Sequence, residues 1–249
     1  MLHAFTHKKS SLHRRYLLQK HREASEGRVT QEDEVTSNVF GTLEFLPESS
    51  VAVFWTHLLS WHAPSFDLPS GRATGASMRF WPSRGKLQPD LLVELKWGSE
   101  IRLLLVELKW RSDLSGEDQL HKQWQLFLSP EERAVALHIF IGIDTAEGIK
   151  ALARENVWCG RMLLLSWMQV LSTVRLVRNA DSPQLCCWAQ HVTSFLRLVG
   201  ISPFLGFRQF PPIELPVQNE PAFWKGSHGV ISLLAPDVPA VTDNPIFFC

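Results

Sequence analysis

The chain has 249 residues, of which 45% are hydrophobic, and its 25 basic and 25 acidic side chains give a formal net charge of zero. This composition is typical of a globular protein with a full core, and one large domain with extensions fits the length better than two independent domains. We find no signal peptide and no apolar stretch long enough to span a bilayer, so we expect a cytoplasmic protein with no membrane partner.

The first 22 residues are strongly basic, with six Lys or Arg side chains and no acid. We assign residues 1–29 to a basic N-terminal arm. Because Lys and Arg neutralise phosphates, Lys8, Lys9, Arg14 and Arg15 are candidate contacts to nucleic acid. A solvated terminus that contacts no ligand is the other open interpretation of this charge.

Apolar periodicity and turn signals predict alternating helices and strands from residue 30 onward. The predicted helices cover residues 30–46, 50–61, 115–130, 146–155, 167–178 and 184–199, and the predicted strands cover residues 78–81, 91–97, 101–109, 135–143 and 162–166. The run 135–143 is almost wholly apolar, which favours a buried central strand. From about residue 206 the chain is rich in proline and aromatic residues, so we assign 206–249 to an irregular tail.

Two of these strands form a predicted β-hairpin. Residues 91–97 and 101–109 are joined at Gly98, followed by a serine, and this dipeptide favours a two-residue hairpin turn. Such a turn fixes the register of the strands, since it pairs Trp97 with Glu100. Every later cross-strand pair follows from this first one.

The register brings three polar side chains together at the far end of the hairpin. Asp90 lies opposite Glu107 on one face of the sheet, where cross-strand Cβ atoms are about 4.5 to 5.5 Å apart. Lys109 shares that face with Glu107, because side chains alternate along a strand. Two carboxylates at this spacing can share one cation, so the hairpin predicts a metal site.

The string Glu-Leu-Lys occurs twice in the hairpin, at residues 94–96 and at residues 107–109. Asp90 and Glu94 are four residues apart on one strand, which separates them by roughly 13 Å at about 3.3 Å per residue. Because magnesium needs oxygen ligands at about 2.0 to 2.1 Å, only the cross-strand pair of Asp90 and Glu107 suits one ion. The alternative interpretation makes both strings polar faces of an amphipathic hairpin.

A further carboxylate lies on the first predicted helix. Projected at 100° per residue, Glu32 falls near the middle of the apolar stripe of that helix, which includes Val35, Val39 and Leu43. A carboxylate directed into a core needs a partner, and a metal site would supply one. Glu32 can equally be a first-turn acid that complements the helix dipole.

These features resemble the PD-(D/E)xK nuclease superfamily, which contains many restriction enzymes, Holliday-junction resolvases and exonucleases. The resemblance covers residues 31–143 and rests on Pro89-Asp90, on Glu107-x-Lys109 and on the order of the predicted elements. It implies an α/β, restriction-endonuclease-like α-β-β-β-α-β core, with a mixed sheet flanked by helices. That core would lie in a nuclease-like domain over residues 30–205 that has helical C-terminal additions.

The resemblance also implies roles for individual residues in the site. Asp90 and Glu107 would hold Mg²⁺ or Mn²⁺ together with the backbone carbonyl of Leu108, and Glu32 would be an additional acid. Lys109 would orient or polarise the attacking water. A divalent ion and a nearby ammonium suit this chemistry, since both favour hydroxide over water.

Two glutamines on the helix after the hairpin complete the implied site. Gln119 and Gln123 are four residues apart and therefore share a helical face. Gln119 matches the position where relatives carry a side chain that touches the water or the scissile phosphate, and we expect Gln123 to contact nucleic acid. Two ordinary solvated glutamines are the alternative.

The implied function is a metal-dependent nuclease that hydrolyses phosphodiester bonds of DNA. We favour an endonuclease, because the exonuclease branch of the family has an aromatic residue where this chain has Gln123. The resemblance further implies a role in a restriction, mobile-element or antiviral-defence system, since members of the family often act there. No helix-turn-helix, zinc finger or Walker loop is visible, so a partner protein would supply sequence recognition or ATPase activity. A non-catalytic subunit that binds nucleic acid or assists assembly is the alternative function.

Overall fold

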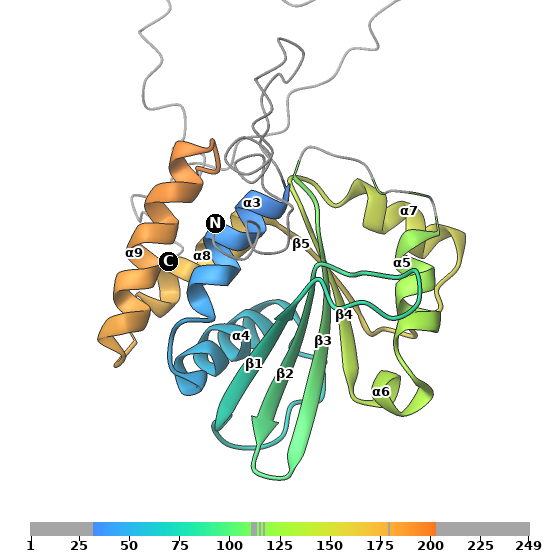
Figure 1. Cartoon of the computed structure of the whole chain (residues 1–249), viewed down its shortest axis with the longest axis horizontal. Coiled ribbons are helices and arrows are strands. Elements are labelled where there is room, and N and C mark those ends of the chain that lie inside the picture. The colour runs from blue at the N-terminus through green and yellow to red at the C-terminus, as the bar shows by residue number, and fades with distance from the viewer. Residues whose placement is uncertain (1–31, 111–113, 115, 117, 179, 203–249) are drawn as a thin grey trace, which may run out of the picture. The chain divides into compact units, whose positions relative to one another are not determined.

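The computed structural model describes residues 32–110, 114, 116, 118–178 and 180–202. Within these residues, one five-stranded mixed sheet has helices against both of its faces (Figure 1). The predicted α/β class is therefore confirmed. The arm and the tail assigned to residues 1–29 and 206–249 lie outside the described residues.

The strands follow one another across the sheet in chain order. They are β1 (Gly75–Phe80), β2 (Leu91–Trp97), β3 (Glu100–Leu108), β4 (Ala136–Gly142) and β5 (Met162–Ser166). The first three strands pair antiparallel, whereas β3, β4 and β5 pair parallel. All seven residues of β4 are buried, which confirms the buried strand that its apolar run predicts.

The hairpin of β2 and β3 has the predicted register. Trp97 pairs with Glu100 next to the turn, and Leu91 pairs with Val106 at the other end. Gly98 has a φ of 62°, a conformation that glycine adopts without the steric cost of a Cβ atom. The two-residue turn therefore sets which side chains face one another over the whole hairpin.

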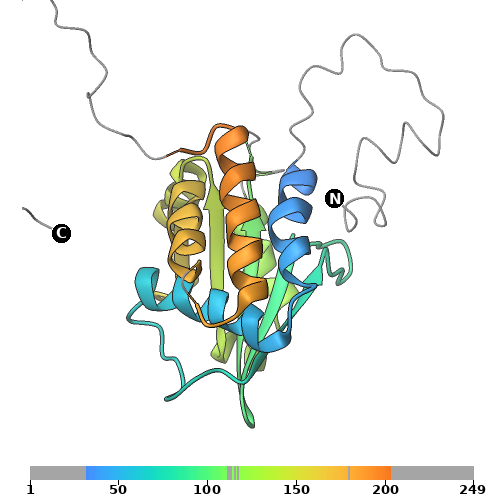
Figure 2. The ribbon, with the colours of Figure 1, turned by 90° about the vertical axis from the view of Figure 1, so that its left-hand side faces the viewer.

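The helices divide between the two faces of the sheet. On one face lie α3 (Glu32–Thr36), α4 (Glu48–His62), α8 (Trp167–Val177) and α9 (Pro183–Leu198), which Figure 2 shows in front of the strands. On the other face lie α5 (Gln119–Lys122), α6 (Pro130–Ala134) and α7 (Ala146–Arg154). None of the helices in the described part of the chain has the length and apolarity that crossing a membrane requires.

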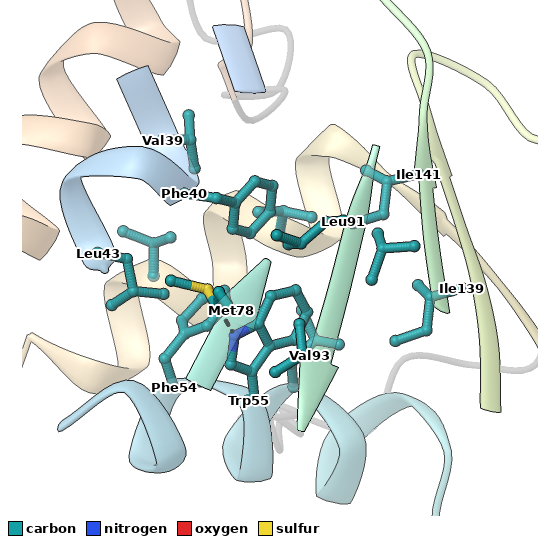
Figure 3. Packing of buried hydrophobic residues seen from close by; sticks show 14 of the residues in the cluster. Val39, Phe40, Leu43, Phe54, Trp55, Met78, Leu91, Val93, Ile139 and Ile141 are labelled. Atoms are coloured by element: carbon teal, nitrogen blue, oxygen red, sulfur yellow. Dashed lines mark hydrogen bonds between the residues drawn. The ribbon is translucent and has the colours of Figure 1, made fainter. Parts of the chain in front are cut away.

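Aromatic packing fixes the first helix on the sheet (Figure 3). The ring of Phe40 stacks on Trp55 of α4 with their centroids 5.4 Å apart, and the indole N–H of Trp55 donates to the sulfur of Met78 on β1 at 3.4 Å. All three side chains are buried. This contact set holds the helix that begins with Glu32 at a defined place beside the sheet.

Two of the predicted helices contain a π-helical turn. The helix that begins as α3 continues through η1 (Ser37–Gly41), and α5 continues through η2 (Gln123–Phe127). A π-turn holds one residue more per hydrogen-bonded ring than an α-turn, so it rotates the side chains that follow, and such turns are frequent at functional sites. Apolar spacing on a regular helix does not reveal this change.

The predicted helix 115–130 is wrong at its C-terminal end, because a separate helix begins there. The chain becomes extended at Leu128, and α6 starts at Pro130 with Ser129 as its N-cap. The hydroxyl of Ser129 accepts from the backbone N–H of Glu132 at 3.2 Å, and the Glu132 carboxylate accepts from the backbone N–H of Ser129 at 2.8 Å. Proline at the first helical position starts this helix, since the N–H that it lacks would have no intrahelical partner.

Candidate metal centre

The two carboxylates predicted to share a cation lie together at the end of the hairpin. Asp90 directly precedes β2, and the pairing of Leu91 with Val106 places it opposite Glu107. Asp90 is 7% exposed and Glu107 is 2% exposed. One carboxylate oxygen of Asp90 accepts from the backbone N–H of Leu108 at 2.8 Å, so Asp90 also caps the end of β3.

Lys109 and Glu32 join this pair from two different elements. The Lys109 ammonium lies 2.9 Å from Oε1 of Glu32 and 3.0 Å from Oε1 of Glu107. The second oxygen of Glu32 accepts from the backbone N–H of Trp110 at 3.2 Å. The first residue of α3 is thus tied to the chain that leaves β3, as expected for a carboxylate that its helix directs inward.

Both predicted glutamines hold the Glu107 carboxylate. Gln119 donates to its Oε1 at 2.5 Å, and Gln123, the first residue of η2, donates to its Oε2 at 2.6 Å. Gln123 is 2% exposed, and its own Oε1 has no hydrogen-bond partner within the described part of the chain. Gln123 thus contacts Glu107 directly, and its contact with nucleic acid stays a prediction.

Two backbone contacts fix the position of Lys109. Its N–H donates to the carbonyl of Ile141 at 2.7 Å, which extends the pairing of β3 with β4 by one residue. Its carbonyl accepts from the indole N–H of Trp167 at 3.0 Å. The sequence does not predict this contact of Trp167, although Trp167 directly follows β5 and parallel strands end at the same edge of a sheet.

Burial and neighbouring charges shift the pKa values of Asp90, Glu107 and Lys109. Burial raises the pKa of Asp90 well above its usual range, and the charges of Glu107 and Glu32 act in the same direction. Burial also raises the pKa of Glu107, against the opposing effect of the Lys109 charge. Burial lowers the pKa of Lys109, but the charges of Glu107, Glu32 and Asp90 together outweigh it and raise that pKa above its usual range. A divalent cation would relieve this crowding of carboxylates.

The second Glu-Leu-Lys string lies away from this centre. Glu94 and Lys96 point from β2 toward solvent, with 34% and 37% of their side chains exposed. The Lys96 ammonium is 3.8 Å from Glu94 and 3.9 Å from Glu48 of α4, which makes these contacts long surface ion pairs. Glu107 and Lys109 are the more buried copy, with 2% and 9% of their side chains exposed, and their role at a metal stays a prediction.

The donor set fits a hard divalent ion such as Mg²⁺ or Mn²⁺. Glu32, Asp90 and Glu107 each offer one oxygen, and these three atoms all lie within 4.8 Å of one another. Carboxylate oxygens without sulfur or imidazole ligands favour magnesium or manganese over zinc or copper.

The basic residues predicted to contact nucleic acid, Lys8, Lys9, Arg14 and Arg15, precede the described residues. The backbone carbonyl of Leu108, predicted as a metal ligand, belongs to the last residue of β3, and its contact with a metal stays a prediction. Comparison of the chain with protein families, with curated proteins and with solved structures finds no match.

Proposed function

We propose that this protein is a Mg²⁺- or Mn²⁺-dependent nuclease that hydrolyses phosphodiester bonds of DNA, and that it acts as an endonuclease. One observation carries the proposal. Three buried or half-buried carboxylates, from Glu32, Asp90 and Glu107, converge within 4.8 Å, and the ammonium of Lys109 lies 3.0 Å from one of them. Carboxylates that hold a divalent ion beside a lysine are a donor set suited to phosphate-ester hydrolysis.

The element order supports a restriction-endonuclease-like core. Helices α3 and α4 precede the antiparallel strands β1, β2 and β3, helix α5 follows, and β4 adds in parallel to β3. This is the α-β-β-β-α-β order that the resemblance to PD-(D/E)xK nucleases implies. The candidate centre lies at the end of the hairpin in this order, between the helix before the sheet and the helix after it.

Each residue of the centre has a task in such a reaction. Glu32, Asp90 and Glu107 would hold the divalent ion, which when bound supplies a Lewis acid that acidifies water and offsets phosphate charge. Lys109 would orient the attacking water and stabilise negative charge on the phosphate oxygens. Gln119 and Gln123 fix both oxygens of Glu107, so this ligand keeps one orientation.

Incubation of the purified full chain with linear and circular DNA tests the proposal. With Mg²⁺ or Mn²⁺ we expect conversion of circular DNA to nicked or linear products, and no conversion with EDTA or in an Asp90→Asn variant. RNA of matched length in the same assay measures the nucleic-acid preference. Binding of DNA without cleavage under either metal would instead favour the non-catalytic subunit.

A further inference from the structure

The Lys109 ammonium lies where a cation bridging two carboxylates would lie. Its distances to Oε1 of Glu32 and to Oε1 of Glu107 are 2.9 and 3.0 Å, and only 9% of its side chain is exposed. Burial lowers the pKa of Lys109, but the charges of Glu107, Glu32 and Asp90 raise it above its usual range. Lys109 is thus the positive charge that balances the crowded acids in this structure.

The hydrogen bonds to Glu107 leave little room for a second cation at the same oxygen. Its Oε1 accepts from both Lys109 and Gln119, and a carboxylate oxygen has about two lone-pair sites. An ion that bridges Glu107 and Glu32 through these oxygens has to replace one of the two donors. Like charges repel, so the ammonium is the donor that leaves.

From this geometry we infer that Lys109 is an internal counter-ion that occupies the metal centre and is released when a divalent ion binds. The inference rests on the proposed function, since it concerns the regulation of the same site. The lysine is engaged by Glu32 and Glu107 until metal arrives, and metal loading frees it for water and phosphate. Binding of the divalent ion therefore both completes the metal centre and releases the Lys109 side chain.

The backbone geometry allows this exchange without movement of the strand. The N–H of Lys109 is bonded to Ile141 and its carbonyl is bonded to Trp167, so the main chain on both sides of the side chain is fixed. Only the four-carbon stem of the lysine has to rotate. Gln119 and Gln123 can hold Glu107 in place while the ammonium leaves.

Calorimetric titration of the full chain with Mn²⁺ tests the inference without any measurement of activity. Lys109→Met keeps most of the side-chain volume and removes the competing charge, so we expect it to bind Mn²⁺ at least about tenfold more tightly than the wild type, equivalent to about 1.4 kcal/mol. Lys96→Met, in the partly exposed copy of the string, is the matched control and should leave the affinity unchanged.

The outcomes separate this inference from the proposed function. Equal or weaker Mn²⁺ binding by Lys109→Met, with clear binding by the wild type, overturns the counter-ion role and leaves the metal centre intact. No binding of Mn²⁺ by the wild type overturns the metal centre itself and the inference with it.

A measurement on the wild-type protein covers the case in which Lys109→Met does not fold. Amine acetylation with and without Mg²⁺, followed residue by residue by mass spectrometry, reports whether the ammonium is released. We expect acetylation of Lys109 to rise several-fold and to saturate with metal binding, while acetylation of Lys96 stays constant. Unchanged or reduced acetylation of Lys109 at saturating Mg²⁺ would overturn the inference.

Discussion

The two Glu-Leu-Lys strings of the hairpin have the same residues in the same order and opposite surroundings. In the β2 copy, Glu94 and Lys96 have 34% and 37% of their side chains exposed, whereas in the β3 copy Glu107 and Lys109 have 2% and 9% exposed. The leucine between them is fully buried in both copies. The short motif therefore says little until its place in the hairpin is known.

Position along the strand explains the contrast. The β2 copy lies near the turn, where its polar side chains are partly exposed to solvent. There the Lys96 ammonium forms long ion pairs with Glu94 at 3.8 Å and with Glu48 at 3.9 Å. The β3 copy ends its strand where α3 and α5 both approach, and there Glu32, Gln119 and Gln123 cover it. The contacts from neighbouring helices, and not the Glu-Leu-Lys string itself, therefore bury Glu107 and Lys109.

The largest expected difference between the copies is in catalysis. Glu107→Gln removes a proposed metal ligand, so we expect cleavage to fall by about a thousandfold or more, because metal catalysis contributes several kcal/mol and each 1.4 kcal/mol is about tenfold in rate. Glu94→Gln should cleave like the wild type. Both variants are compared by their cleavage rates on circular DNA with Mg²⁺. Similar rates for the two would contradict the assignment of Glu107, and not Glu94, as a metal ligand.

The pH dependence of metal binding should come from the buried copy. The pKa values of Asp90 and Glu107 are raised, chiefly by burial, so both groups hold protons at pH values where ordinary carboxylates have lost them. A ligand must lose its proton to bind metal, so the Mn²⁺ affinity should fall as pH drops through the raised pKa values, by up to about tenfold per pH unit per proton.

Titrations with Mn²⁺ across a series of pH values measure this slope. Glu94→Gln should reproduce the wild-type slope, and Glu107→Gln should flatten it because one titrating ligand is gone. A wild-type affinity that does not change with pH would contradict the raised pKa values of the two carboxylates.

The hydrogen bond from Gln123 to Glu107 should contribute to the stability of the fold. Gln123→Leu leaves an oxygen of the buried Glu107 without its donor, so we expect the free energy of unfolding to fall by about 1 to 3 kcal/mol. Gln125→Leu, two residues away and exposed, should change it by less than about 0.5 kcal/mol. Urea unfolding at constant metal concentration gives both values, and equal effects would argue against the contact.

The smallest expected effect is that of breaking the partly exposed ion pairs of Lys96. Lys96→Ala removes contacts of 3.8 and 3.9 Å between partly exposed side chains, and such pairs contribute about 0 to 1 kcal/mol. We expect urea midpoints close to those of the wild type and only a weak salt dependence of the difference. A loss above about 2 kcal/mol would mean that this copy, too, has a structural role.

Much of the fold could be predicted because local signals are strong in the sheet. The turn at Gly98 fixes the pairing of Trp97 with Glu100, and the apolar run of β4 requires burial on both faces. The sequence does not predict the π-turns that begin at Ser37 and Gln123, because apolar spacing does not distinguish an α-turn from a π-turn. The sequence predicts a helix end at Pro130, where α6 in fact starts, because proline is common both just after a helix and at its first position.

The centre could be predicted where it depends on strand geometry. The hairpin register alone brings Asp90 and Glu107 together, and the helical projection directs Glu32 inward. The burial of Gln123 and its bond to Glu107 could not be derived, because they depend on how a π-turn packs against the sheet. The bond from Trp167 to Lys109 depends on tertiary placement of β5, for which the sequence carries only the position of the tryptophan after a strand.

The turn of the hairpin is a suitable place to attach a fluorescent label. Gly98 has open space around its α-carbon and Ser99 is exposed, while Glu107 lies seven residues beyond Glu100, roughly 23 Å along the strand at about 3.3 Å per residue. A fluorophore attached through Ser99→Cys, after replacement of the four native cysteines of the chain, would lie at the hairpin turn, away from the charged centre. The hairpin can thus serve as a spectroscopic ruler for ligands that approach its opposite end.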